Sequence, residues 1–253
     1  MDEQLPEPIP AATLVVFREV AAGPPEILIV ERARAMAFAG GMLVFPGGRI
    51  DPGDRALATT LGGDAEDLAA RIAAVRETIE EAGIAVGLSQ LPDGDTLETM
   101  RASLHDGQSF GAVLADAGHH LDLQGIVPFA RWLPRHAHMR IFDTRFYLAR
   151  LPAGAPEPRV DATENSRAFW ASAADVLAMC DRGEAAVIFP TRRNLERLAQ
   201  YESFDEAADD ARSRPDRVVT PWTEERDGAD YLCIPDDLGY PVTAEALSGA
   251  MRG

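Results

Sequence analysis

Three glutamates in the first third of the sequence have the spacing of a metal-binding helix face. Glu77, Glu80 and Glu81 occupy positions i, i+3 and i+4, which an α-helix brings to one side because it turns by about 100° per residue. Carboxylates this close repel one another, and a divalent cation relieves the repulsion. Magnesium prefers such oxygen ligands. The spacing therefore predicts a magnesium-type site, with a solvated acidic face as the alternative in a chain this acidic.

The helix that carries the glutamates is expected to run over Asp64–Ala82, since Asp64 is a good N-cap and Gly83 a good stop. The glutamates then lie near its C-terminus, where the helix dipole disfavours negative charge and a bound cation is more favourable. Arg76 lies beside them and can orient one carboxylate through a charge-assisted hydrogen bond. The opposite side is apolar and predicts a core-packing face formed by Leu68, Ile72, Val75 and Ile79.

A glycine-rich loop precedes the helix, and loop and helix together resemble the Nudix box. Adjacent glycines at Gly47 and Gly48 let the backbone approach a ligand closely. The family motif runs glycine, five residues, glutamate, seven residues, then Arg-Glu-aliphatic-any-Glu-Glu-any-Gly-aliphatic. Gly48 matches its first glycine, and Asp54 stands where the family has glutamate. The second half is matched by Arg76, Glu77, Glu80, Glu81, Gly83 and Ile84.

The box departs from the family pattern in length and in two residues. Thr78 replaces an aliphatic residue, and Asp54 is one methylene shorter than glutamate. Between Asp54 and Arg76 lie 21 residues (76 − 54 − 1) where the motif has seven, so residues 55–68 are interpreted as an insertion. We expect Arg55–Gly63 to form a bulging loop and Asp64 onward to extend the helix backwards, since surface insertions cost little free energy.

The resemblance implies an α/β chain with the Nudix fold, a mixed β-sheet sandwiched between helices. It implies a hydrolase that cleaves a diphosphate with Mg2+ or Mn2+. The implied metal ligands are Glu77, Glu80, Glu81 and the carbonyl of Gly47 or Gly48. The base that activates water varies in the family, so the candidates here are Glu80 and, on a later loop, Glu164, with Glu157 as a weaker option; Arg76 completes the catalytic set.

The segment before the box indicates a substrate class. Residues 29–48 resemble the corresponding segment of the coenzyme A diphosphatase branch, in particular its peroxisomal members with an enlarged box. Those members also have a segment similar to Phe142–Ala149 and a helical C-terminal extension. The resemblance implies cleavage of coenzyme A or acyl-CoA to adenosine 3′,5′-bisphosphate and phosphopantetheine. The positions of basic residues are compatible with such a substrate: Arg32 and Arg34 come just before the glycine loop, where phosphates would approach, and Arg145 lies on the strand face that could point into a cleft. The candidate substrate-binding residues are therefore Arg32, Arg34, Gly47 and Arg145, although each arginine is also explained by a surface ion pair.

Other functions stay open. The same box also fits hydrolysis of ADP-ribose, NADH or another dinucleotide. A Nudix-fold protein that senses a nucleotide without cleaving it is a further alternative, but a sensor has no need of the three glutamates. His136 and His138 could suggest zinc, yet no cysteine or acid at ligand spacing supports it.

Composition limits the partners. The 253-residue chain has a formal net charge of −17, and all of its 24 basic residues are arginines. This charge argues against nucleic-acid binding, which needs a basic footprint. No apolar run is long enough to span a membrane, and the acidic, proline-rich start lacks the features of a signal peptide. We expect a cytoplasmic protein with a small nucleotide-like ligand; a homodimer is an open alternative.

The pattern along the chain predicts a flexible leader (1–10), a Nudix domain (11–175) and a helical C-terminal extension packed on it (176–253). Gly40–Asp54 is expected to be a loop containing one short strand. Asp95–His120 reads as helix with glycine breaks, and the last forty residues have no clear assignment. The predicted strands are Thr13–Arg18, Glu26–Arg32, Met42–Phe45, Ile126–Leu133, Ile141–Leu151 and Arg167–Ala171. The later helices are Ala173–Arg182, Thr191–Tyr201 and Phe204–Arg212.

Overall fold

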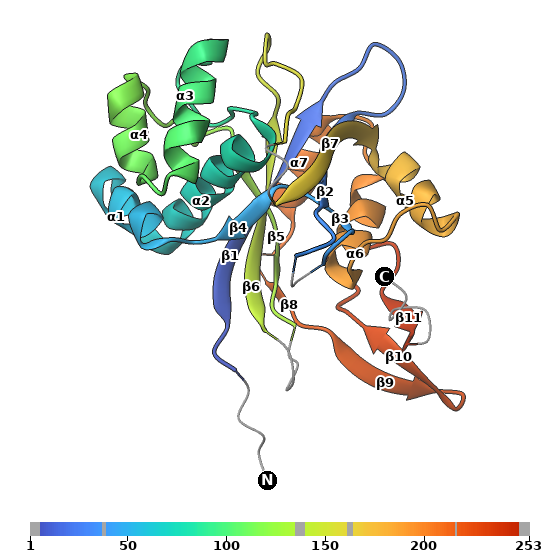
Figure 1. The fold of residues 1–253 in the computed structure, drawn as a ribbon. Coiled ribbons are helices and arrows are strands. Elements are labelled where there is room, and N and C mark those ends of the chain that lie inside the picture. The colour runs from blue at the N-terminus through green and yellow to red at the C-terminus, as the bar shows by residue number, and fades with distance from the viewer. Residues whose placement is uncertain (1–5, 37–38, 135–139, 161–163, 216, 248–253) are drawn as a thin grey trace.

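A mixed β-sheet with helices on both of its faces forms the body of the protein (Figure 1). The computed structural model describes residues 6–36, 39–134, 140–160, 164–215 and 217–247. The large sheet has eight strands, and a second sheet of three strands lies beside it near the C-terminus. The expected α/β class and the sandwiched sheet are confirmed.

The centre of the large sheet is a long parallel pair. β1 (Ile9–Arg18) and β6 (Phe142–Arg150) run side by side over nine register positions. β5 (Val127–Trp132) pairs antiparallel with β6, and the short β8 (Val218–Val219) extends that edge. On the other side lie β2 (Glu26–Arg32), β3 (Leu43–Val44), β4 (Gly47–Arg49) and β7 (Asn165–Ser172).

The central strands are apolar on both faces because both faces are covered. Leu14 and Val16 of β1 belong to one hydrophobic cluster, whereas Val15 and Phe17 belong to another on the opposite side of the sheet. Such near-continuous apolar runs are typical of strands buried between two layers. Figure 1 shows α1–α4 over one face of the sheet and α5–α7 over the other.

The helices of the first layer are α1 (Pro52–Leu61), α2 (Ala65–Ala82), α3 (Gly94–His105) and α4 (Phe110–Ala117). In α2, Asp64 caps the N-terminus by accepting hydrogen bonds from the amides of Glu66 and Asp67, and Gly83 ends the helix with φ 64°. Both predicted helix ends are therefore confirmed. Thr78 fits the core because its fully buried hydroxyl donates to the carbonyl of Ala74 at 2.7 Å.

The expected bulging loop at Arg55–Gly63 is wrong, because most of that segment is helical. Asp51 precedes Pro52 at the first helical position, and the carboxylate of Asp54 accepts from the amide of Asp51 at 2.9 Å. This is a capping box in which aspartate takes the place of the usual glutamate. In addition, the fixed backbone angle of proline favours the first position of a helix. The first part of the insertion thus belongs to α1, which packs on α2, and its last residues form the start of α2, as expected from Asp64 onward.

The C-terminal extension is helical only as far as Ser213. Its helices are α5 (Ala173–Asp181), α6 (Phe189–Leu198) and α7 (Phe204–Ser213). Beyond them the chain forms β8 and the small sheet of β9 (Trp222–Arg226), β10 (Ala229–Cys233) and β11 (Ala244–Ala246). At the other end, β1 already begins at Ile9, inside the expected leader. None of the described helices is long and apolar enough to cross a bilayer.

Candidate functional site

A split in the sheet brings the glycine loop to the acidic end of α2. Along one edge, β1 pairs with β2 at Phe17 and Arg18, but with β4 at Ala11–Thr13. The chain crosses from β3, which pairs with β2, to β4, which pairs with β1. This crossing places Gly47 and Gly48 against the last turns of α2.

The contact between Gly48 and Glu77 leaves no room for a side chain on the loop. A Cβ atom added at Gly48 would lie 2.3 Å from Oε1 of Glu77, which is far inside van der Waals contact. Beside it, the amide of Gly47 donates to Oε2 of Glu81 at 3.0 Å. Glycine is therefore required at position 48 because the Glu77 carboxylate lies directly against the backbone, and at position 47 because a Cβ there would lie 2.5 Å from the carbonyl oxygen of Ala12.

The acidic face of α2 is not a solvated surface. The exposed fraction of the side chain is 15% for Glu77, 19% for Glu80 and 6% for Glu81. Burying carboxylates is costly unless they are paired or hold a cation. The alternative of a solvated acidic face is therefore wrong.

Arg76 occupies the centre of the acidic group. Its Nε and Nη2 donate to the two carboxylate oxygens of Asp54 at 3.0 and 2.9 Å. Its Nη1 donates to Glu77 at 2.9 Å and reaches both oxygens of Glu80 at 3.3 Å. A further bond runs from Nη2 to the carbonyl of Arg49 at 3.0 Å. Arg76 therefore joins α1, α2 and the glycine loop, as a planar five-donor group can.

The three glutamates have raised pKa values even with Arg76 beside them. Burial raises the pKa of Glu77 to about 8; Arg76 opposes this shift, and Glu81 and Glu80 add to it. Burial also raises the pKa of Glu81 to about 7, against the Gly47 amide and Arg32, whose Nη1 lies 3.7 Å from Oε1. Burial raises the pKa of Glu80 in the same direction. These carboxyl groups therefore take up protons readily when no other cation is present.

The donor set suits a hard divalent ion. It offers three carboxylates that are buried or largely shielded from solvent, and carboxylate oxygens are among the ligands that Mg2+ and Mn2+ prefer. Within the part of the chain that the structure describes, no three histidine, cysteine or acidic side chains converge closely enough to share an ion. Instead, Glu77 and Glu80 contact Arg76, and Glu81 contacts Gly47. Binding an ion would require these side chains to exchange such contacts for the metal.

Two of the expected residues, Glu164 of the later loop and Arg32 at the end of β2, lie close enough to Glu81 to act on its charge. The carbonyl of Glu164 accepts from the amide of Ala33 at 2.8 Å, and its charge raises the pKa of Glu81. Arg34 lies on the turn after β2 and is exposed. The structure thus brings Glu164 and Arg32 together with the glutamates. His136 and His138 lie outside the described residues.

The weaker base candidate has a different partner. Glu157 is 78% exposed and pairs with Arg18, whose Nη1 lies 2.9 Å from its carboxylate. Arg18 ends β1 and also binds Glu26. Glu157 is therefore held at the sheet end by a surface ion pair rather than by the acidic group of α2.

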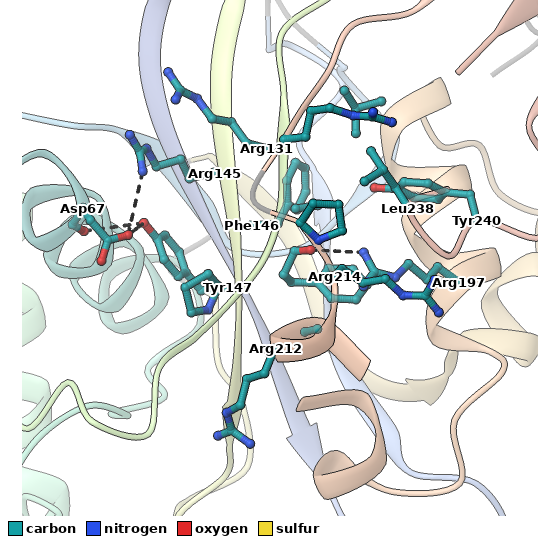
Figure 2. A pocket seen from close by; sticks show the side chains of 17 residues that line it. Asp67, Arg131, Arg145, Phe146, Tyr147, Arg197, Arg212, Arg214, Leu238 and Tyr240 are labelled. Atoms are coloured by element: carbon teal, nitrogen blue, oxygen red, sulfur yellow. Dashed lines mark hydrogen bonds and ion pairs between the residues drawn. The ribbon is translucent and has the colours of Figure 1, made fainter. Parts of the chain in front are cut away.

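Arg145 is not brought to the glutamates. Figure 2 shows its guanidinium directed to Asp67, with 3.8 Å between Nη1 and Oδ1. Asp67 precedes Glu77 by ten residues of α2, or about 15 Å of helix. Arg145 instead lines a cavity of about 290 Å3 over β5 and β6. Tyr147 also binds Asp67, through its hydroxyl at 2.9 Å, so the face of β6 that holds Arg145 packs on the N-terminal half of α2.

Two residues at the site were missed in the sequence. Asp54 was matched to the motif without a role, although the order Asp51-Pro52-Gly53-Asp54 is a helix-start signal that could have placed it on a helix. Arg101 of α3 was not singled out, yet it contacts the end of α2. No local signal could have identified it, because the carbonyls that accept its hydrogen bonds belong to residues at least 21 positions away.

Comparisons with known proteins agree on one family. The crystal structure of a NUDIX hydrolase from Alicyclobacillus acidocaldarius superposes with a TM-score of 0.70 at 30% sequence identity, covering 80% of this chain and 96% of that one. A Caenorhabditis elegans protein named as nudix hydrolase 7 is 25% identical over 189 residues. The match covers 71% of this chain but only 57% of that relative's length. A scan against protein-family profiles gives no match.

Proposed function

Because this chain belongs to the Nudix hydrolase family, we propose that it cleaves the diphosphate of coenzyme A or an acyl-CoA with the help of Mg2+ or Mn2+. The products would be adenosine 3′,5′-bisphosphate and (acyl-)phosphopantetheine. The observation that carries the metal-dependent part is the buried group of Glu77, Glu80 and Glu81 against Gly47 and Gly48. The CoA part rests on the resemblance of residues 29–48 to the CoA diphosphatase branch.

The metal ligands in this proposal are Glu77, Glu80 and Glu81, with a carbonyl of the glycine loop. When bound, a divalent ion neutralises diphosphate charge and lowers the pKa of water. The raised pKa values of Glu77 and Glu81 support this assignment, since a cation would replace the protons that these groups otherwise retain.

The remaining residues would bind substrate and move protons. Arg76 holds the Glu77 and Glu80 carboxylates in place from one side. Either Glu80 or Glu164 would accept the proton of the attacking water. Arg32 and Arg34, at the end of β2 and on the turn after it, are the substrate-facing cations of the proposal. We leave Arg145 out of this set because it is engaged by Asp67.

A substrate panel tests the CoA assignment. The purified protein would be incubated with Mg2+ and, separately, CoA, acyl-CoA, ADP-ribose, NADH and dinucleoside polyphosphates, and the products separated by chromatography. We expect the highest kcat/KM for a CoA compound and release of adenosine 3′,5′-bisphosphate. Faster turnover of ADP-ribose or NADH than of every CoA compound would replace the proposal with the dinucleotide alternative.

A single substitution tests the metal mechanism against nucleotide sensing. Glu81→Gln removes one charge from the buried group while keeping its shape, and we expect turnover to fall by at least about 100-fold. Glu196→Gln is the matched control, because Glu196 is also largely buried and paired with arginine but lies on α6, over the other face of the sheet. If Glu81→Gln kept full turnover, the three glutamates would not be metal ligands in catalysis.

A further inference from the structure

Arg101 is a nearly buried arginine whose hydrogen bonds go to main-chain carbonyls. It lies on α3 and is 6% exposed. Its Nε donates to the carbonyl of Ile79 at 3.0 Å, and its Nη2 donates to the carbonyls of Glu80 and Arg159 at 3.0 and 2.9 Å. Its one ion-pair contact among the described residues is a long one, 3.8 Å to the exposed Glu98. Arg101 is therefore anchored to backbone rather than to a matching carboxylate.

The carbonyls that Arg101 binds belong to the last turn of the glutamate helix. The final four carbonyls of an α-helix have no partner within the helix, and in α2 these come from Ile79, Glu80, Glu81 and Ala82. The amide of Gly83 returns to Ile79, and the amide of Arg159 donates to Ala82 at 2.8 Å. Arg101 supplies the bond to Glu80 and a second bond to Ile79. Side-chain and backbone donors together thus cap this helix end.

The positive charge of Arg101 also offsets the partial negative charge at the C-terminal end of α2. The C-terminal end of a helix carries partial negative charge, which disfavours the carboxylates of Glu77, Glu80 and Glu81 in the last two turns. A guanidinium bonded to the terminal carbonyls opposes that partial charge without occupying the carboxylates themselves. It leaves the acidic face free for ligands, whereas Arg76 contacts that face directly.

Arg101 further connects this helix end to a second segment. Arg159 is bound twice there, by its amide to Ala82 and by its carbonyl to Arg101. Glu164, the loop candidate for the base, follows five residues later. Gly83 lies directly beneath the guanidinium, since a Cβ added there would be 3.3 Å from Nη1 of Arg101. The guanidinium thus packs against the point where α2 ends.

We propose that Arg101 is a positioning residue: by binding the Ile79, Glu80 and Arg159 carbonyls, it fixes the last turn of α2, which carries Glu80 and Glu81, and holds that turn against Arg159. The role rests on the proposed function, because it concerns how the box glutamates hold a divalent ion. Arg101 does not itself touch the ion or the substrate.

The test compares Arg101→Met and Arg101→Lys with wild type. Mn2+ binding is followed by the electron paramagnetic resonance signal of the free ion, and kcat and KM are measured on the best substrate of the panel, below the melting temperature of every variant. We expect Arg101→Met to weaken Mn2+ binding by about tenfold and to lower kcat by a similar factor with little change in KM, the size seen for residues that orient metal ligands. Arg101→Lys should recover part of both losses.

Arg193→Met is the matched control for losing a buried arginine. Arg193 is 2% exposed on α6 and pairs with Glu196 and Glu245, so its loss should lower the melting temperature but leave Mn2+ affinity unchanged. If Arg101→Met behaves like this control, Arg101 is merely structural and the inference fails. If wild type itself neither binds Mn2+ nor hydrolyses any substrate of the panel, the proposed function fails instead.

Discussion

Asp54 and Arg76 form a buried, two-pronged ion pair that ties the inserted helix to the glutamate helix. The guanidinium donates to both oxygens of Asp54 at 3.0 and 2.9 Å, and the carboxylate is 1% exposed. Asp54 also closes the capping box of α1. The enlarged box therefore keeps its arginine anchored even though 21 residues separate the two partners in sequence.

Removing the Asp54 carboxylate should damage both stability and activity. Asp54→Ala leaves part of the Arg76 charge unpaired in a buried place, which costs about 3 kcal/mol of unfolding free energy. Arg76 would also be free to reorient toward Glu77 and Glu80, so kcat should fall. Chemical denaturation and steady-state kinetics measure the two effects. Asp54→Glu offers the same charge with one more methylene and should lose less; equal losses in both variants would show that the pair is not the anchor.

The two loop glycines should respond differently to alanine. In Gly48→Ala the three atoms nearest to the new methyl group all belong to the end of the Glu77 side chain, which can move, so we expect a drop in activity of at least about tenfold with a small change in melting temperature. In Gly47→Ala it would lie 2.5 Å from the carbonyl oxygen of Ala12, and because backbone cannot yield cheaply the fold should be destabilised.

Gly94→Ala is the control for the glycine pair. Apart from the adjacent residues and the backbone of its own helix, no atom lies within 4 Å of a Cβ at Gly94, which opens α3, so neither activity nor stability should fall. The Gly48 prediction is contradicted if Gly48→Ala keeps wild-type activity and metal affinity.

Metal binding and stability should both depend on pH through Glu77. Its pKa rises from 4.5 to about 8 in the folded, metal-free protein. Between these two values the folded state holds a proton that the unfolded state has released, so the stability of the metal-free protein should fall as pH rises through this window. Thermal unfolding in EDTA, measured from about pH 5 to pH 9, checks this sign.

Magnesium should reverse that trend. Because the ion competes with the protons on Glu77 and Glu81, its affinity should increase with pH, and binding near neutral pH should release protons. Calorimetric titrations in buffers of different ionisation enthalpy measure the released protons. Affinity that is constant across this pH range would exclude these carboxyl groups as ligands.

Glu164→Gln separates the two base candidates. If Glu164 accepts the proton of the attacking water, this substitution should lower kcat by about 100-fold or more and leave Mn2+ affinity near that of wild type. Glu80→Gln should instead weaken Mn2+ binding as well. A Glu164→Gln enzyme with normal kcat would assign the base to Glu80.

Arg34 is expected to contribute to substrate binding rather than to chemistry. It is exposed on the turn after β2, so Arg34→Ala should leave the fold intact. If it contacts the 3′-phosphate of CoA, its loss should raise KM for CoA by about tenfold, the worth of one charged hydrogen bond. The KM for 3′-dephospho-CoA should not change. Equal effects on both substrates would place Arg34 elsewhere.

The sequence by itself determined the helix over Asp64–Ala82, its two ends and the spacing of the three glutamates. These depend on local rules: a side-chain cap at Asp64, a left-handed residue at Gly83 and the helical repeat. It also predicted the strands that become β5 and β6, because alternating and apolar runs follow from the two faces of a strand.

Only the tertiary structure decided what faces the glutamates. Whether the acidic face is solvated or buried depends on the split of β1 between β2 and β4, which brings Gly48 against Glu77 from outside the helix. The contacts of Arg101 with α2, and of Arg145 with Asp67 instead of the glutamates, likewise join residues more than 20 positions apart. Periodicity within one segment carries no information on such contacts, since they depend on how separate elements pack.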